Sequence, residues 1–423
     1  FKILNSKFQI LKYMKIAIIH SRLDCIGGTQ RKVLSIACAL QSAGHTVRVY
    51  TLSYDKDNCY SHMLSQLRVI SLPGYAKDAQ KTRIPFLRFL NYCVYSRNES
   101  NAAKKLACMV DRSANVLMSF DKIGFRAAAF FKRDVKNIPS LVIMDDILTK
   151  GWAAWRKSQF DPSFRLPWRQ RFFYAVVDWY EVRKFILPHE HMAVIDERTK
   201  EWARIYFKKN AVVVRNGLSC DYFSYTPRRH PEKRTIRLLA AGMYFLHRRY
   251  EDCIEAVAIL QHTGIDALLD IVGDYRMDEY RAYQRRLACG AHRLGVSDRV
   301  KFLGKISEAE LLSKYRDADI YISSNHLQSW GLAVFEAMSC GLPVIVSRSA
   351  GASEVLTHEK NAMLVSPKSS QEIADAVAKL ARDPVLYGSL SKNGREFAVE
   401  NITWEKTAQS LCEIFTCAIR KDQ

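Results

Sequence analysis

The sequence lacks several features that mark common protein classes. None of its hydrophobic runs approaches the roughly 18 uninterrupted residues that a membrane-spanning helix needs. The G-x-G-x-x-G fingerprint of dinucleotide binding is absent, which argues against an ordinary dehydrogenase. Its 11 cysteines include no C-x-x-C pair, so we expect reduced thiols in a cytoplasmic protein. No carboxylates or histidines cluster at metal-ligand spacing, so we expect neither a cofactor nor a metal requirement.

Acidic residues are too few to balance the basic ones. Lys and Arg number 64 against 43 Asp and Glu, a formal net charge of +21. This charge predicts an anionic partner such as a nucleotide, a lipid diphosphate, phospholipid head groups or nucleic acid. No zinc spacing, recognition-helix pattern or aromatic RNA-binding motif accompanies the charge, so we predict no nucleic-acid partner. The alternative, a basic nucleic-acid-binding protein, would bind DNA or RNA with a strong salt dependence.

What the sequence does contain is two series of short apolar runs that alternate with helical periodicity. The first series begins at 15–20 and the second at 235–241. Such alternation predicts parallel sheets, so the fold class is α/β with two Rossmann-like domains. We place an N-terminal extension at 1–13, the two domains at 14–214 and 215–402, and a last helix at 403–423.

The most informative stretch is 319–346, D-I-Y-I-S-S-N-H-L-Q-S-W-G-L-A-V-F-E-A-M-S-C-G-L-P-V-I-V. Apolar runs at its two ends predict parallel strands, with a short helix between them. Gly331 lies where the loop enters the helix, so a ligand's phosphate could approach the free N–H groups of the first turn. Glu336 is close enough to reach toward a bound nucleotide, although an acid near a helix start also simply stabilises the helix.

The run Q-S-W-G-L-A-V-F-E-A-M-S-C-G-L-P-V within that stretch resembles the signature of retaining glycosyltransferases of the glycosyl transferases group 1 type, which have the GT-B fold. The resemblance implies that Glu336 binds the ribose of a nucleotide sugar. The family has a second Glu where this chain has Gln328, whose amide can still bond the hydroxyls of the donor sugar without bringing charge. The resemblance also implies donor contacts at Trp330, Gly331, Leu332 and Ala333, with the amides after Gly331 cradling the diphosphate.

Two further segments resemble donor-contacting loops of the same family. Gly27 and Gly28 open the first predicted helix, where the family's glycine loop faces the diphosphate; from the residues alone, this pair predicts only a tight turn. After the first strand of the second domain, the family has an Arg and then a Lys on the phosphates. This chain has Met243 and Arg248 there, and Arg249 is a second candidate to grip the departing diphosphate.

Two other segments complete the predicted site. Gly304, Lys305 and Ile306 match the loop that holds the nucleobase in the family. Asp145 and Asp146 end a predicted strand where the acceptor side would lie, and they either bind sugar hydroxyls or cap the next helix. Family members also run the last helix back to the first domain.

Basic and aromatic residues occur together in 81–97 and 165–184. Helices of this composition suit an anionic membrane surface, since aromatic rings sit at head-group depth and cations meet phosphates. The alternative is two ordinary amphipathic helices with solvated charges. The second segment also resembles part of mannosyltransferases that build lipid-linked oligosaccharides. We therefore expect a cytoplasmic protein that lies against the inner face of a membrane.

The sequence and the resemblance together predict a retaining hexosyltransferase with a GT-B fold, in which two Rossmann-like domains face each other across a cleft. It would move a hexose from GDP-mannose or a UDP-sugar to a glycan or lipid-linked acceptor, in polysaccharide, lipopolysaccharide or glycolipid synthesis. One alternative is a nucleotide-sugar-binding module with impaired catalysis. Another is a sugar phosphorylase or sugar-phosphate synthase on the same fold.

Overall fold

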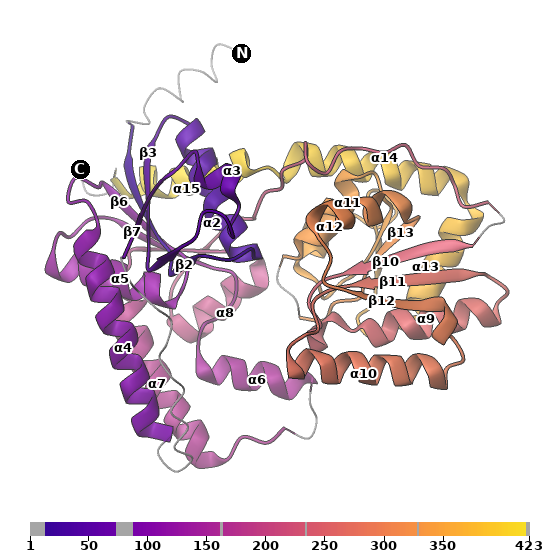
Figure 1. Ribbon diagram of the computed structural model, residues 1–423, viewed down its shortest axis with the longest axis horizontal. Coiled ribbons are helices and arrows are strands. Elements are labelled where there is room, and N and C mark those ends of the chain that lie inside the picture. Colours follow the sequence, from indigo (N-terminus) through magenta and orange to yellow (C-terminus); the bar gives the residue numbers. More distant parts are fainter. Residues whose placement is uncertain (1–12, 73–87, 161–163, 233–234, 328–329, 420–423) are drawn as a thin grey trace. The chain divides into compact units, whose positions relative to one another are not determined.

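The computed structural model describes residues 13–72, 88–160, 164–232, 235–327 and 330–419. The chain divides into two compact units (Figure 1). The N-terminal unit comprises Phe1–Ile195, Thr199–Val214 and Trp404–Gln423, and the C-terminal unit comprises Asp196–Arg198 and Arg215–Thr403. The predicted extension at 1–13 lies outside the described residues except for Tyr13.

The N-terminal unit is built on a parallel sheet in the order β5-β3-β1-β6-β7-β8-β9. Its strands are β1 (Lys15–Ile19), β3 (Thr46–Thr51), β5 (Arg68–Ser71), β6 (Val116–Ser119), β7 (Ser140–Met144), β8 (His191–Val194) and β9 (Val212–Val213). A separate pair joins β2 (Arg22–Leu23) to β4 (Ser53–Tyr54). Strands β6 and β7 are buried along their whole length, as expected for a parallel sheet with helices on both faces.

Helices cover both faces of this sheet. They are α2 (Gly28–Ser42), α3 (Ser61–Leu64), α4 (Arg88–Met109), α5 (Lys122–Asp134), α6 (Lys150–Phe160), α7 (Trp168–Phe185), α8 (Glu197–Phe207) and α15 (Trp404–Ile419). The last helix, α15, shares a core with α2, in which Trp404 and Phe415 pack with Val33 and Leu34. The chain's C-terminal helix therefore belongs to the N-terminal unit.

The C-terminal unit has its own parallel sheet in the order β12-β11-β10-β13-β14-β15. Its strands are β10 (Ile236–Ala241), β11 (Ala267–Val272), β12 (Val300–Gly304), β13 (Ile320–Ser323), β14 (Val344–Ser347) and β15 (Met363–Val365). Its helices are η1 (Leu246–Arg248), α9 (Tyr250–His262), α10 (Asp278–Arg293), η2 (Ser297–Arg299), α11 (Glu308–Asp317), α12 (Leu332–Ser339), η3 (Gly351–Val355), α13 (Ser370–Arg382) and α14 (Pro384–Asn401).

Both sheets reverse their strand order beside the first strand. In the N-terminal unit β1 lies between β3 and β6, and in the C-terminal unit β10 lies between β11 and β13. The loops at the carboxyl ends of the two strands part there, which leaves the crevice where ligands of doubly wound sheets bind. In the described part of the chain, no helix combines the length and the apolarity that crossing a bilayer requires.

Candidate functional site

In the C-terminal unit, the loops that follow β10 and β13 are joined across the point where the strand order reverses. The Ser324 hydroxyl, just past β13, is 2.8 Å from the carbonyl oxygen of Arg248 and 3.0 Å from that of Arg249. The His326 amide donates to the carbonyl oxygen of His247 at 2.8 Å. The fold therefore brings the predicted arginine pair beside the segment that leads to Gly331.

Arg248 is the cation best placed to meet an anion in this crevice. Its guanidinium lies against Gly242, where an added Cβ would come within 2.6 Å of Arg248 Cζ. Gly242 also has φ of +147°, a backbone conformation that favours glycine. Among the described residues, the buried Nε of Arg248 has no hydrogen-bond partner. The guanidinium thus lies against the Gly242 backbone, and part of its hydrogen-bonding capacity is unused among the described residues.

Arg249, the second candidate, is occupied by local carboxylates. It adopts a left-handed conformation with φ of +52° and ψ of +42° at the start of α9. Its guanidinium lies 2.9 Å from Glu251 Oε1, and its Nε donates to Asp252 Oδ2 at 3.0 Å. Because two acids already balance its charge, Arg248 is the stronger candidate for the diphosphate.

The surroundings of His326 report a positive local field. Burial, and to a lesser extent the positive charges of Lys368, Arg249 and Arg198, lower the pKa of this imidazole to about 4. A bound phosphate would relieve that repulsion. The crevice therefore combines cationic side chains with a histidine that is neutral at physiological pH.

Glu336 lies on α12, one turn beyond Gly331. Gly331 has φ of +78° and ends the loop, and α12 has no acid in its first turn and no side-chain cap. Its first amides therefore remain suited to an anion. Glu336 is only 6% exposed, and its Oε2 accepts a hydrogen bond from the Tyr315 hydroxyl at 2.9 Å. The hydroxyl fixes the orientation of a carboxylate that we predict to face ribose.

The remaining predicted donor contacts have varied surroundings. The Trp330 ring is buried, stacks on Phe335 at 4.6 Å and donates from Nε1 to the carbonyl oxygen of Asn216 at 3.0 Å, so only its backbone could meet a ligand. Leu332 and Ala333 form the first turn of α12. Gln328, the predicted contact to the donor sugar, lies outside the described residues.

The predicted nucleobase loop follows β12, two strands away from β10. Gly304 ends this strand with φ of +70°, and Lys305 is exposed while Ile306 is half-buried. Two strand spacings amount to about 10 Å. The loop is therefore on the same carboxyl edge as Arg248 but separated from it by β11.

In the N-terminal unit, Gly27 and Gly28 lie at the start of α2. Gly27 is extended at φ −170°, and a Cβ on Gly28 would meet nothing within 4 Å, so neither position demands glycine for its own backbone. Asp145 forms an ion pair with Lys32, a buried lysine of α2. This pair ties the end of β7 to the helix that the glycines open.

Asp146 has a structural environment. Its carboxylate accepts from Trp152 Nε1 at 2.7 Å and forms an ion pair with Arg156, and both partners lie on α6. Burial raises the pKa of this carboxyl. Of the two acids predicted for the acceptor side, Asp146 is therefore the one that holds the next helix.

One pair in the N-terminal unit escaped the sequence analysis. His20 directly follows β1, and its Nδ1 lies 2.9 Å from Asp121 Oδ2, which follows β6. The carboxylate also accepts from the amides of Ser21 at 2.8 Å and Gly124 at 2.7 Å. Burial alone would raise the pKa of Asp121, but His20 and these hydrogen bonds outweigh it and lower the pKa to about 2. The sequence signal that could have predicted this pair is that His20 and Asp121 each follow an apolar run.

Comparison with known proteins identifies the C-terminal unit. Residues 226–397 match the family model described as glycosyl transferases group 1. The matched region covers less than half of this chain and lies within the C-terminal unit. Curated relatives include mannosylfructose-phosphate synthase of Agrobacterium fabrum, 28% identical over 41% of this chain and 39% of the relative. N-acetyl-alpha-D-glucosaminyl L-malate synthase of Bacillus anthracis is 30% identical over 57% of this chain and 58% of the relative. The chain thus covers less than two thirds of each of these two relatives.

Solved structures extend the similarity to nearly the whole chain. Sucrose-phosphate synthase from Thermosynechococcus elongatus has a TM-score of 0.71 at 20% identity, covering 96% of this chain and 99% of that one. The Anabaena protein HepE in complex with UDP has a TM-score of 0.69 at 16% identity, covering 96% and 100%. At these identities the likeness concerns the fold. The predicted α/β class with two Rossmann-like domains of the GT-B type is confirmed.

No metal site is visible in the described part of the chain, where no three His, Cys, Asp or Glu side chains converge. The ten cysteines described there are all free thiols. Metal independence itself stays a prediction.

Proposed function

We propose that this glycosyltransferase-family chain moves a hexose from a nucleoside diphosphate sugar to a hydroxyl of a glycan or lipid-linked acceptor, with retention at the anomeric carbon. The observation that carries the proposal is Arg248, a cation fixed at the reversal point of the C-terminal sheet with an unused buried Nε among the described residues. The start of α12 and the Tyr315-held Glu336 lie on the strand-loop-helix unit next to it. Together these groups suit a diphosphate and a ribose.

In the proposed reaction, the bond between the anomeric carbon and the diphosphate oxygen breaks as the acceptor oxygen attacks from the same face. The acceptor's proton passes to an oxygen of the leaving phosphate. Negative charge grows on the diphosphate as the sugar departs, and a fixed guanidinium and helix amides stabilise that charge most in the transition state. Arg248 and the first amides of α12 would therefore act on the rate as well as on binding.

The relatives support a nucleotide-sugar donor without fixing its base. One curated relative, 31% identical over 29% of this chain, is named a GDP-mannose-dependent mannosyltransferase, from Mycobacterium tuberculosis. The HepE structures were solved with UDP and with UDP-glucose. We therefore retain both GDP-mannose and UDP-sugars as donors, and we place the acceptor at an anionic membrane surface reached from the cytoplasm.

The test is a calorimetric titration of the purified full chain with UDP, GDP, ADP and CDP, followed by transfer assays with sugars of the preferred nucleotide. We expect one nucleoside diphosphate to bind best, and Glu336→Ala to weaken it. Proton NMR of the product would then show the anomeric configuration of the donor preserved. Inversion, or no nucleotide binding at all, would overturn the proposal. Binding without turnover against any acceptor would favour the impaired binding module.

A second candidate function has its own support. Two of the similar proteins are named sugar-phosphate synthases, one by sequence and one by structure. If this chain works likewise, its acceptor is a free sugar phosphate. Transfer to soluble hexose phosphates in the absence of membranes would distinguish this function from a glycan or lipid-linked acceptor.

A further inference from the structure

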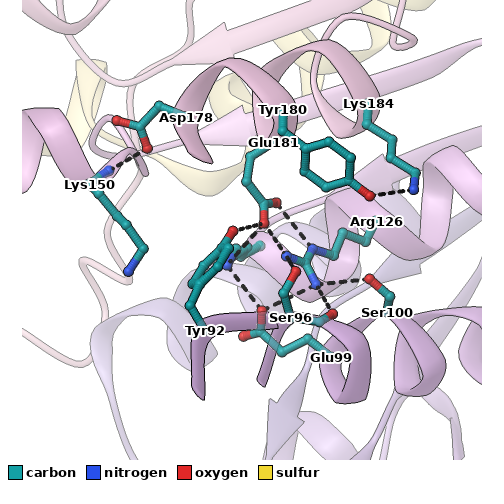
Figure 2. A network of polar contacts seen from close by, with 11 residues as sticks. Tyr92, Ser96, Glu99, Ser100, Arg126, Lys150, Asp178, Tyr180, Glu181 and Lys184 are labelled. Carbon is teal, nitrogen blue, oxygen red and sulfur yellow. Dashed lines mark hydrogen bonds and ion pairs between the residues drawn. The ribbon is translucent and has the colours of Figure 1, made fainter. Parts of the chain in front are cut away.

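Helix α7 directs its acidic residues inward, into a buried ionic network (Figure 2). Arg126 of α5 is fully buried and forms ion pairs with Glu181 of α7 and Glu99 of α4. The Tyr92 hydroxyl donates to Glu181 at 2.7 Å. Asp178, the other acid of α7, accepts from the backbone amide of Lys150 at 2.7 Å. Because Arg126 would otherwise be a buried unpaired charge, this network fixes the rotation of α7 about its axis.

The face of α7 that points away from this network is aromatic and exposed. Trp168, Phe172, Val176 and Trp179 are 73%, 69%, 47% and 62% exposed. At about 100° per residue, their spacing puts all four within an arc of about 80°. Helices of globular proteins normally bury the apolar stripe and expose the charges. The arrangement in α7 is the reverse, and we call Trp168, Phe172, Val176 and Trp179 the α7 stripe.

The contrast with another helix of the same chain is direct. Helix α13 buries Ile373, Val377 and Leu380 and keeps its charged residues at the surface. Exposing the α7 stripe to water would be unfavourable by the ordinary rules of burial. Large exposed apolar patches rimmed by polar residues mark surfaces that bind a partner or a membrane.

Every exposed charge on α7 itself is positive. Both acids of the helix belong to the inward network, while Arg169, Arg171, Arg183 and Lys184 are exposed, as is Arg165 before the helix. Two of these cations lie over aromatic rings. Arg169 Cζ is 5.5 Å from the centroid of the Trp168 ring, and Arg183 Cζ is 5.7 Å from that of Trp179. The α7 stripe is therefore an exposed aromatic surface flanked by positive charges.

The surface at the C-terminal part of the stripe is hollowed. A cavity of about 280 Å³ is lined by Trp179, Val182, Arg183, Leu187 and Tyr206 together with Thr149 and Asp178. It combines one exposed guanidinium and the Asp178 carboxylate with apolar walls. Arg183 and the apolar walls suit a phosphate joined to an aliphatic or glycerol moiety, while the Asp178 carboxylate accepts from the amides of Lys150 and Gly151.

We propose that the α7 stripe docks this protein on an anionic lipid bilayer, with the tryptophans at head-group depth and the flanking arginines on lipid phosphates. Aromatic rings and cations combined on one helix face are the composition that binds such interfaces. A second copy of the chain would fit less well, since a two-fold contact would set the same cations against each other. This inference deepens the membrane-side acceptor of the proposed function, but donor binding does not enter its argument.

The test is sedimentation of the full chain with vesicles of phosphatidylcholine alone and of phosphatidylcholine with an equal part of phosphatidylglycerol. We expect binding only to the anionic vesicles, and weaker binding at high salt. Replacing the rings in Trp168→Ala, Phe172→Ala and Trp179→Ala together should lower the partition coefficient about a hundredfold or more. Reversing two cations, in Arg169→Glu with Arg183→Glu, should lower it at least about tenfold.

Matched controls come from the C-terminal unit. Met277→Ala with Val385→Ala removes apolar side chains that are 60% and 77% exposed. Arg285→Glu with Arg293→Glu makes the same charge change on the exposed side of α10. Both controls should bind vesicles like the native chain. Circular dichroism should show all variants folded, because the substituted side chains are exposed.

Three outcomes would overturn the docking surface. The stripe variants could bind anionic vesicles as well as the controls do. The native chain could fail to bind those vesicles but form a dimer that the stripe variants abolish, which would make a second copy the partner. It could also ignore vesicles and stay monomeric. Titration of the stripe variants with free nucleoside diphosphates, without vesicles, separates this test from the proposed function: they should keep native affinity, whereas Glu336→Ala should lose affinity and still sediment with vesicles.

Discussion

Both sheets reverse their strand order beside the first strand, but the charged side chains at the two reversal points differ in how far they are paired within the fold. At the reversal point of the N-terminal sheet, His20 faces Asp121, and nearby Lys32 is paired with Asp145. At the reversal point of the C-terminal sheet, Arg248 keeps a buried Nε with no partner in the described part of the chain. The charges of Lys32 and Asp145 are paired within the fold, whereas the unused Nε of Arg248 leaves hydrogen-bonding capacity for an anion.

The difference shows why the same topology can serve two purposes. A doubly wound sheet supplies a crevice wherever its strand order reverses, and the side chains after the strands decide what enters it. In the C-terminal unit, the missing side chain of Gly242 leaves space for the Arg248 guanidinium. In the N-terminal unit, His20 and Asp121 lie at the corresponding point. This difference supports the proposal that the diphosphate binds in the C-terminal crevice.

The largest effect is expected from Arg248→Ala. Removing one fixed donor from a site of developing negative charge costs about 2.7–4 kcal/mol, or roughly 10²–10³ in kcat. Sugar-transfer kinetics with the preferred donor would measure it. Arg285→Ala, an exposed cation of α10, should leave the rate unchanged. Equal rates for Arg248→Ala and the native chain would show that the unmatched guanidinium is no part of the reaction.

Arg249→Ala should behave differently from its neighbour. Its partner Asp252 has a side chain that is only 1% exposed, so the substitution leaves a buried carboxylate without its cation. We expect lowered stability in urea, with a smaller change in kcat than for Arg248→Ala. A loss of kcat as large as that of Arg248→Ala with full stability would mean that both arginines act on the diphosphate.

The next effect belongs to the N-terminal reversal point. The carboxyl of Asp121 has its pKa lowered from 3.8 to about 2, so its charge stabilises the folded state at pH values above 3.8. That contribution, about 2 kcal/mol, is lost as the pH falls toward 2. Asp121→Asn should therefore lower the free energy of unfolding in urea by about that amount and flatten its acid dependence. Nucleotide affinity should not change; a changed affinity would erase the contrast between the two crevices.

Much of this architecture could be predicted from the sequence, because strands buried on both faces are apolar along their whole length. The apolar runs at the two ends of 319–346 became β13 (Ile320–Ser323) and β14 (Val344–Ser347). The glycine at the start of α12 was predictable from its place between an apolar run and a helical period. The resemblance to the glycosyl transferases group 1 followed from the same stretch, since its residue pattern is specific.

The pairing of side chains could not be predicted in this way. The ion pairs of Arg249 depend on its left-handed backbone, which no local pattern required. His20 and Asp121 meet only because β1 and β6 are neighbours, and that register is a property of the whole sheet. The inward rotation of Glu181 likewise depends on Arg126, from a different helix. Composition marked α7 as basic and aromatic but did not show which face is exposed.

Two glycine substitutions test whether the Arg248 guanidinium needs the space beside Gly242. Gly242 and Gly264 both have positive φ, +147° and +76°, but an added Cβ meets the guanidinium at Gly242 and nothing within 4 Å at Gly264. Each alanine should cost about 1–3 kcal/mol of stability from backbone strain. Only Gly242→Ala should also weaken nucleoside diphosphate binding, by about tenfold, because it displaces the guanidinium. Equal nucleotide affinity in both variants would contradict the proposed role of Arg248.

The smallest effect is expected from Tyr315→Phe, which removes one hydroxyl from the C-terminal crevice. That hydroxyl donates to Glu336 at 2.9 Å, and both side chains are buried, so its loss removes one hydrogen-bond donor from a buried carboxylate. A single buried hydrogen bond to a charged group is worth about 1.5–3 kcal/mol, part of which a bound ribose hydroxyl would restore. We therefore expect stability to fall in the free protein and to recover partly when the nucleoside diphosphate is bound, which thermal unfolding with and without the ligand measures. If the loss of stability is the same in both states, Glu336 meets no ribose, and the C-terminal crevice holds the diphosphate through Arg248 and the helix amides alone.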